Sequence, residues 1–376
     1  MNKKLLSSLI AVACAAGVIS TANAGITVYK EGEKYVKIGG RIQLQYHSND
    51  PDNGRSTDEV FFRRLRPYIE GSLIKDWRGK FQFDLGKAEG ENEIAIKDAY
   101  AQYRGFNNMK LTIGNANFPF SREFLTSSKK QQLVERTFVG DHNYGTPDRN
   151  IGLHLTGYTD SKFITWGASI ASASIDPSNS KLDFDTPVNR NTDFEDGWMF
   201  GGRADFHLLG GGAGFKQGDF NGKTRASIGL AGYSWSNDDD LAATNKSVDD
   251  VTGFEVSGAF RSSGFSVDAQ YNSFDSDLVQ RGVTSGLYKN SSTTLENWSI
   301  EGGYMVIPNT LELVAGFSEQ DADNYATEWT RTSIGANWFL HKNKMKVQLS
   351  YRDGSDLKGV KGADEEELFM QMQYVF

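Results

Sequence analysis

Residues 36–47 read VKIGGRIQLQYH, and residues 368–376 at the other end of the chain read LFMQMQYVF. In both stretches apolar or small residues at even positions alternate with mostly polar residues at odd positions. Strict alternation gives a β-strand one apolar face and one polar face. Both stretches therefore predict amphipathic strands rather than helices.

The same period of two returns along the chain. It recurs at residues 163–171, 198–207, 253–261, 265–272, 298–306, 311–318, 331–340 and 345–352. Short turns, at 261–264, 307–309 and 341–344, alternate with long polar connections at 172–196, 236–250, 273–297, 319–328 and 353–366. Short turns at one end and long loops at the other are typical of a transmembrane β-barrel, in which strands have about ten residues. The prediction is an all-β chain that forms a transmembrane antiparallel β-barrel of about 16 strands.

A soluble β-sandwich or solenoid is the alternative, because its apolar strand faces would form a buried core. Three features favour the membrane. The strands repeat evenly over the whole chain, the polar faces are rich in Gln, Asn, Ser and Gly, and aromatic residues such as Trp166, Trp298 and Tyr351 lie near expected strand ends. Aromatic girdles of this kind mark the two membrane interfaces of a barrel.

Residues 1–24 are expected to be a secretory signal peptide, and residues 25–376 the barrel domain. Lys3 and Lys4 precede an apolar stretch, and Ala22-Asn23-Ala24 fits the cleavage pattern. A transmembrane helix is the first alternative, but the apolar stretch is short for a bilayer. A lipoprotein cut before Cys14 is the second. Export of such a barrel predicts a bacterial outer-membrane location.

The charge balance excludes one class of partner. The chain has 40 Lys+Arg and 48 Asp+Glu, a net charge of −8, which argues against nucleic acid. Removal of residues 1–24 takes away two lysines and no acid, leaving a net charge of −10.

No nucleotide loop or nucleophile motif occurs, and the five histidines are widely spaced, so no enzyme activity, cofactor or metal site is expected. Asp238–Asp240 forms either a cation-binding or a solvated acidic loop.

Five segments together resemble one protein family. Residues 36–47, 60–85, 97–114, 118–138 and the C-terminal LFMQMQYVF are similar to the phosphate-selective porin O and P family. The resemblance implies a 16-stranded, homotrimeric outer-membrane channel narrowed by inward-folded loops and lined by basic residues that bind small anions. It places Arg41, Arg63 and Arg64 at the central anion site. It also implies that Ser127, Ser128 and Lys129 complete that site.

Residues 115–150, between strands expected near 109–114 and 151–157, are a candidate constriction loop. They carry the cations Arg122, Lys129, Lys130, Arg136 and Arg149. The alternative is an extracellular loop whose charges meet solvent. Arg41 shares the polar face of its strand with Gln43 and Gln45, so it is expected in the lumen, because an arginine facing lipid at mid-bilayer costs about 2–4 kcal/mol.

Arg63 and Arg64 have a second interpretation, in which they brace the barrel wall through ion pairs with acids such as Asp84, Asp98 or Glu70. Two positions also depart from the family pattern. Phe124-Leu125 stand where phosphate-specific members carry a lysine, and Lys97 with Asp98 stands where they carry an acid. Of the scattered mid-chain bases Arg190, Arg203, Lys216, Lys223 and Arg225, only Arg203 is clearly on a polar face.

The expected function is a passive channel for small anions such as phosphate or related oxyanions. The alternatives are a weakly selective porin for small polar solutes, or an outer-membrane adhesin or enzyme that uses the barrel as an anchor. Outer-membrane lipid and lipopolysaccharide are the expected surroundings. Phe376, at the end of the last strand, is expected to be recognised by the barrel-assembly machinery.

Overall fold

The computed structural model describes residues 25–86, 94–176, 178–185, 195–238 and 247–376. The expected signal peptide, Arg190, Asp239 and Asp240 lie outside the described residues. Within the described ranges, no helix has the length and the apolar character needed to cross a membrane.

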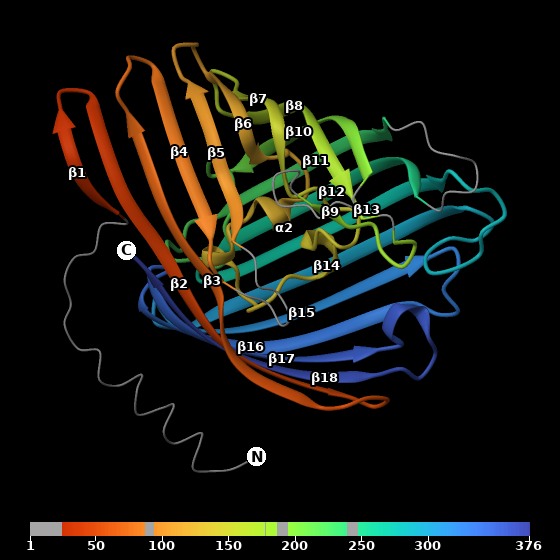
Figure 1. Cartoon of the computed structure of the whole chain (residues 1–376). Helices are drawn as coiled ribbons and strands as arrows, with labels where there is room; N and C mark the ends of the chain where they lie inside the picture. Colours follow the sequence, from red (N-terminus) through yellow and green to blue (C-terminus); the bar gives the residue numbers. More distant parts are fainter. Residues whose placement is uncertain (1–24, 87–93, 177, 186–194, 239–246) are drawn as a thin grey trace.

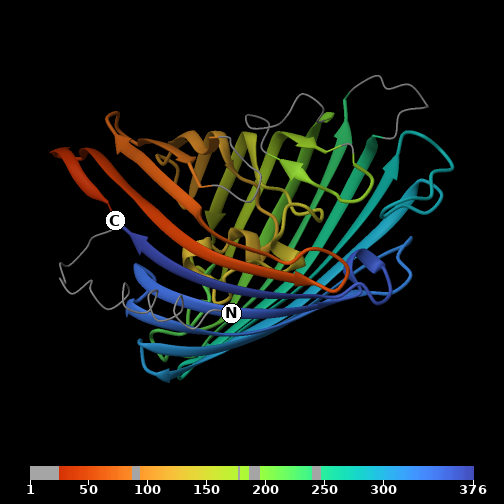
Figure 2. The ribbon, with the colours of Figure 1, turned by 60° about the horizontal axis from the view of Figure 1, so that its bottom comes forward.

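Sixteen of the described strands form one closed antiparallel barrel, as predicted (Figures 1 and 2). The first and last strands of the ring pair with each other, and β8 pairs directly with β10. The ring consists of β2 (Lys34–Pro51), β3 (Thr57–Ser72), β4 (Trp77–Asp84), β5 (Ala95–Tyr103), β6 (Met109–Asn117), β7 (Arg149–Tyr158), β8 (Ile164–Ile175), β10 (Glu195–Leu209), β11 (Arg225–Asn237), β12 (Val248–Ser262), β13 (Phe265–Leu278), β14 (Ser292–Ile307), β15 (Leu311–Ala322), β16 (Trp329–His341), β17 (Met345–Ser355) and β18 (Glu365–Val375). Two short strands extend it, β1 (Ile26–Glu31) beside β2 and β9 (Phe184–Asp185) beside β8.

The alternating pattern of the sequence becomes the two faces of the barrel wall. On β17, Leu349 is 46% exposed on the outside, whereas its neighbour Gln348 is 1% exposed inside. On β18, Tyr374 is 40% exposed and Gln373 is fully buried. Because apolar side chains face outward and polar ones inward, the wall is suited to a lipid exterior and a hydrated interior.

The strands are longer than the sequence pattern predicts. The predicted long loops therefore include residues that belong to the ends of strands. Residues 273–297 were expected to be one loop, but β13 continues to Leu278 and β14 begins at Ser292. The reason is that apolar alternation ends where the lipid ends, while strand pairing continues beyond it. Register pairs such as Asp275 with Thr294 extend the sheet with polar residues on both faces.

At the end with short turns, the connection between β10 and β11 is an exception. Residues 210–224 fold into the barrel, after a turn in which Gly210, Gly211 and Gly212 have φ values of 58°, 74° and 83°. Residues that carry a side chain rarely adopt these positive φ values, which explains why three glycines occur here. Inside, the Gln217 N–H donates to the Lys130 carbonyl at 3.1 Å, so this turn contacts the candidate constriction loop.

The segment between β6 and β7, residues 118–148, folds inward as predicted. It contains α2 (Arg122–Leu125) and the short 3-10 turns η1 (Ser128–Lys130) and η2 (Phe138–Gly140). The far wall holds its backbone: Lys346 Nζ donates to the Gln131 carbonyl at 2.8 Å and Asn337 Nδ2 to the Gln132 carbonyl at 3.0 Å.

An apolar core inside the barrel adds to this attachment. Phe118 and Phe120 of the segment are fully buried there with Trp235 of β11 and Phe274 of β13. The half of the lumen near β11–β15 is therefore packed, and open space remains along β2–β7.

A charge on the outer face tests the assignment of that face to lipid. Leu349→Arg is expected to lower the free energy of unfolding in lipid vesicles by about 2–4 kcal/mol, because Leu349 lies at the middle of β17. Val360→Arg is the matched control, since Val360 is 58% exposed in the loop before β18; it should change the unfolding free energy by less than about 0.5 kcal/mol. Urea unfolding in vesicles measures both. Equal effects of the two substitutions would contradict the assignment.

Candidate functional site

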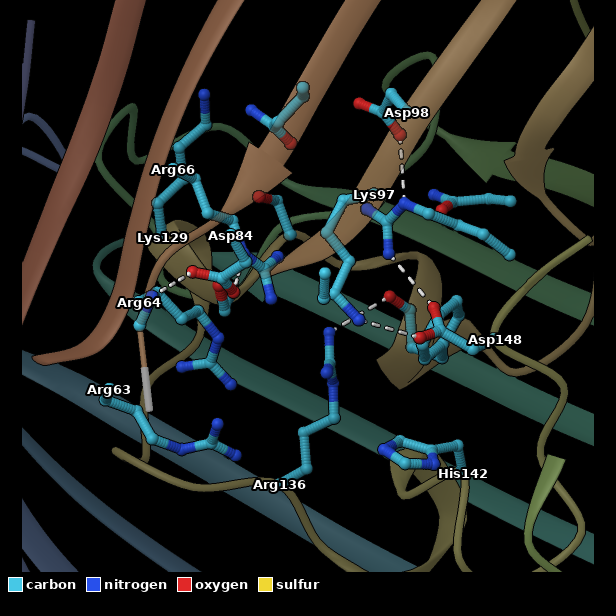
Figure 3. Close-up of a pocket in the computed structure, with 18 of the residues that line it drawn as sticks. Arg63, Arg64, Arg66, Asp84, Lys97, Asp98, Lys129, Arg136, His142 and Asp148 are labelled. Atoms are coloured by element: carbon cyan, nitrogen blue, oxygen red, sulfur yellow. Dashed lines mark hydrogen bonds and ion pairs between the residues drawn. The ribbon is translucent and has the colours of Figure 1, made fainter. Parts of the chain in front are cut away.

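The open half of the lumen contains a cavity of about 1470 Å³. Its lining comes mainly from β2–β7 and from residues 124–148, with further residues from 176–185 and from β16–β18. Lining residues come from several elements, and Figure 3 shows Arg63, Arg64 and Arg136 pointing toward one space. The seven residues expected at an anion site all line this cavity, namely Arg41, Arg63, Arg64, Ser127, Ser128, Lys129 and Arg136. Their part in anion binding stays a prediction.

A β-bulge explains how two consecutive arginines both face the cavity. Gln43 of β2 pairs with Arg64, but the next residue, Leu44, pairs with Phe62. Arg63 is thus an extra residue in β3, and such a bulge shifts the alternation of the strand by one position. Strand alternation alone would send one of the two arginines into lipid.

A β-bulge of the same kind occurs on β5. Gln82 pairs with Asp98 and Phe83 pairs with Ile96, which leaves Lys97 as the extra residue. Lys97 and Asp98 therefore both line the cavity. Lys97 Nζ donates to Asp148 Oδ2 of the inward segment at 3.2 Å, so the bulge gives this segment an ionic contact to β5.

Arg63 forms an ion pair with the constriction loop. Its Nε donates to Glu135 Oε1 at 2.7 Å and its Nη2 to Glu135 Oε2 at 3.2 Å. Burial alone would raise the pKa of the Glu135 carboxyl, but the guanidinium groups of Arg63 and Arg64 hold it well below its usual range. Glu135 is thus a permanent anion that neutralises Arg63.

The acids expected to brace Arg63 and Arg64 hold other bases instead, so those expected partners are wrong. The bases that these acids hold lie on a neighbouring strand, except Arg149, which lies on β7, two strands from Asp98 on β5. The ion pairs are Asp84 with Arg66 at 2.5 Å, Asp98 with Arg149 at 2.9 Å and with Lys80, and Glu70 with Arg78. Because each of these acids is used, the interior charges along this wall are largely balanced.

Arg64 and Arg41 are not balanced in this way. Arg64 is 3% exposed and its Nη1 donates to Gln43 Oε1 at 3.2 Å, while Glu135 Oε2, already held by Arg63, is 4.0 Å away. Arg41 Nη1 donates to the hydroxyls of Ser128 at 2.7 Å and Ser127 at 3.3 Å. Its Nε is buried, and no partner for it is found among the described residues. The expected grouping of Arg41 with Ser127 and Ser128 is present.

Arg136 and Lys129 add two further cations from the segment. Arg136 Nη2 donates to the carbonyl oxygens of Phe124 at 3.2 Å and Thr126 at 3.4 Å, and its buried Nε has no acceptor within the part of the chain that the structure describes. The Lys129 ammonium has no ion pair among the described residues. Burial and the nearby Arg41 lower the pKa of Lys129 to about 8.

We call Arg41, Arg64, Lys129 and Arg136 the central cation cluster. Among the described residues, the hydrogen bonds of its guanidinium groups go to neutral acceptors, and Glu135 Oε2, 4.0 Å from Arg64, is shared with Arg63. Two of its buried N–H donors lack an acceptor in the described structure. Buried donors in proteins nearly always have a partner, including water or an ion. Guanidinium groups offer fixed donors that match the oxygens of carboxylates and phosphates. The geometry therefore suits a small oxyanion.

Other predicted cations do not join this cluster. Arg122 donates to Asp268 Oδ1 of β13 at 2.9 Å. Arg203 forms ion pairs with Asp205 and Glu255. Arg66 was missed, although it follows Arg64 by two positions and so shares its face. Among the described residues no group of three or more His, Cys, Asp or Glu side chains could hold a metal ion.

Comparisons with known proteins agree with this architecture. The sequence model of the family "Phosphate-selective porin O and P" matches residues 36–376. Porin O of Pseudomonas aeruginosa is 24% identical over 431 aligned residues, covering 96% of this chain and 95% of that protein.

Solved structures share the fold at low identity. The anion-selective porin of Comamonas acidovorans has a TM-score of 0.62 at 11% identity, with 92% of this chain and 100% of that chain covered. OmpF of Salmonella typhi, solved with daunomycin, has a TM-score of 0.60 at 12% identity, with 93% and 100% covered. The chain is an outer-membrane β-barrel that belongs to the phosphate-selective porin O and P family.

Proposed function

We propose that the barrel is a passive channel that prefers small anions, and that the central cation cluster is its selectivity site. The observation that carries the proposal is the pair of buried, unpartnered Nε donors of Arg41 and Arg136 beside the cavity. A water-filled passage lined by one excess sign of charge concentrates ions of the opposite sign. No chemical step is required.

The mechanism depends on weak binding at several neighbouring groups. An anion that leaves Arg41 can meet Arg64, Lys129 or Arg136 without crossing a neutral gap, because all four line the same cavity. Conduction needs binding strong enough for capture and weak enough for release. Glu135 limits the strength by neutralising Arg63.

Small oxyanions such as phosphate are the proposed solutes. Family membership, the likeness to Porin O and the likeness in fold to an anion-selective porin support this class. A weakly selective pore is the second candidate, because Asp84, Asp98 and Asp148 also line the cavity. The two candidates differ in whether neutralising one member of the cluster changes ion preference.

The proposal includes a homotrimer in outer-membrane lipid and lipopolysaccharide, exported by residues 1–24 and inserted by the barrel-assembly machinery through Phe376. A structure with the same fold, OmpT of Vibrio cholerae, was solved in a trimer form. The Phe376 ring is 37% exposed, and its main chain exchanges hydrogen bonds with Gly40 at 2.9 and 3.1 Å. Because the terminal ring is exposed at the end of β18, the barrel-assembly machinery can contact it before β18 pairs with β2 and the barrel closes.

Loss of a positive charge from the cluster and loss of the negative charge of Glu135 beside it should move the reversal potential in opposite directions. In a tenfold KCl gradient across a planar bilayer, we expect the wild type to prefer chloride, Arg64→Gln to lower that preference, and Glu135→Gln to raise it by releasing Arg63. Arg55→Gln is the control, because Arg55 is exposed in the turn between β2 and β3. A preference for potassium in the wild type would overturn the proposal. Unchanged potentials in both Arg64→Gln and Glu135→Gln would favour the weakly selective pore.

Anion preference should fall as the pH rises from 7 to 9. The pKa of Lys129 is about 8, so its ammonium is charged below that pH and neutral above it. Lys129→Arg should keep its preference at pH 9, since a guanidinium stays protonated. Lys129→Met should show the low preference already at pH 7. Reversal potentials at pH 6, 7, 8 and 9 measure this, and a Lys129→Arg profile identical to the wild type would exclude Lys129 as the titrating group.

A further inference from the structure

An aromatic ring lies among the charged residues that line the cavity. Phe124 of α2 is 5% exposed and lines the cavity, and Leu125 beside it is half-buried and lines it too. The remaining wall around the central cation cluster is mostly charged or polar. An apolar surface at this place is unexpected for a site that would hold only a hydrated inorganic ion.

The fold fixes the position of this ring. Ser121 precedes α2 and its Oγ accepts from the Phe124 N–H at 3.1 Å, which caps the short helix. The Phe124 carbonyl accepts from Arg136 Nη2, and the Arg136 guanidinium lies 5.0 Å from the centre of the Phe124 ring. One face of a cluster cation is thus covered by the ring, and the ring and the cation cannot move independently.

Leu125 continues the apolar surface toward the serine side of the cluster. Two residues later come Ser127 and Ser128, whose hydroxyls accept from Arg41. Phe124 and Leu125 therefore form an apolar part of the cavity lining, with Phe124 against Arg136 and Leu125 close in the chain to the serines that bind Arg41. We call these two side chains the apolar shelf.

We propose that the constriction prefers organic anions that carry a short apolar group next to the charged one, such as small aliphatic or aromatic carboxylates, over inorganic oxyanions of equal charge. This inference rests on the proposed anion channel. The carboxylate binds the central cation cluster, and the apolar group contacts the apolar shelf.

Two physical effects act in the same direction. Contact with the shelf removes apolar surface of the solute from water, which is favourable. A phosphate at the same place turns some of its oxygens toward a ring that has no donor to offer, and loss of hydration without a compensating hydrogen bond is costly. Both effects favour a solute with one charged and one apolar end.

A homologous series tests the proposal. Block of the chloride current of wild-type channels in planar bilayers is measured for acetate, propionate, butyrate and valerate, with benzoate and phosphate for comparison. Full burial of a methylene corresponds to roughly a fourfold gain in binding, so partial contact with the shelf predicts about a twofold fall in half-blocking concentration for each added methylene. Phosphate is expected to block less well than butyrate or benzoate.

Variants assign the effect to the shelf. Phe124→Ser and Leu125→Asn should each flatten the dependence on chain length, whereas Phe124→Leu should retain it. Phe61→Ser is the matched control, since Phe61 is a ring on β3 that lines the same cavity outside the shelf. Leu125→Asn provides the test if Phe124→Ser does not fold.

The outcomes separate this inference from the proposed function. No gain with chain length in the wild type, or an undiminished gain in the folded shelf variants, would overturn the shelf proposal while leaving an anion channel intact. Preference of the wild type for potassium in the salt gradient would instead overturn the channel proposal.

Discussion

The attachment of residues 118–148 to the far wall of the barrel is the constraint on which the pore depends. A chain segment inside a barrel must satisfy its backbone groups, since a buried unpaired carbonyl or N–H is costly. Here wall side chains do so: Lys346, Asn337 and Asn272 donate to the carbonyls of Gln131, Gln132 and Val139. The apolar core around Phe118 and Phe120 adds burial on the same side. These contacts fill one half of the lumen and hold Lys129, Glu135 and Arg136 opposite β2 and β3.

The interior charges then divide into two kinds. Arg63, Arg66, Lys97 and Arg149 each have a carboxylate within 3.2 Å and strengthen the wall or the loop. In the described ranges, Arg41 and Arg136 donate to hydroxyls and carbonyls, and Lys129 has no carboxylate partner. Arg64 donates to Gln43, and its nearest ion-pair partner, Glu135, is 4.0 Å away. Selectivity is expected from the second kind, because paired charges largely cancel at the distance of a passing ion. The net charge of −8 for the whole chain says little about the pore, since it does not record which charges are paired.

The barrel was predictable from alternation, because lipid outside and water inside impose a period of two on every strand. The same reasoning correctly placed Arg41 inside. It could not place both Arg63 and Arg64 inside, since a bulge shifts the period and leaves no local signal in the sequence; the family resemblance supplied that position. The partner of Arg63 was missed because Glu135 is 72 residues away and depends on how the loop folds. Loop lengths were overestimated, because strand pairing beyond the membrane needs no apolar residues.

We propose that the central cation cluster forms an anion site in the lumen. Anomalous scattering from crystals of the wild-type protein soaked in bromide locates such a site directly. We expect the strongest bromide peak within hydrogen-bonding distance of guanidinium groups of the central cation cluster, between Arg41, Arg64 and Arg136. Bromide found only elsewhere on the protein, with these arginines bound to carboxylates, would contradict it.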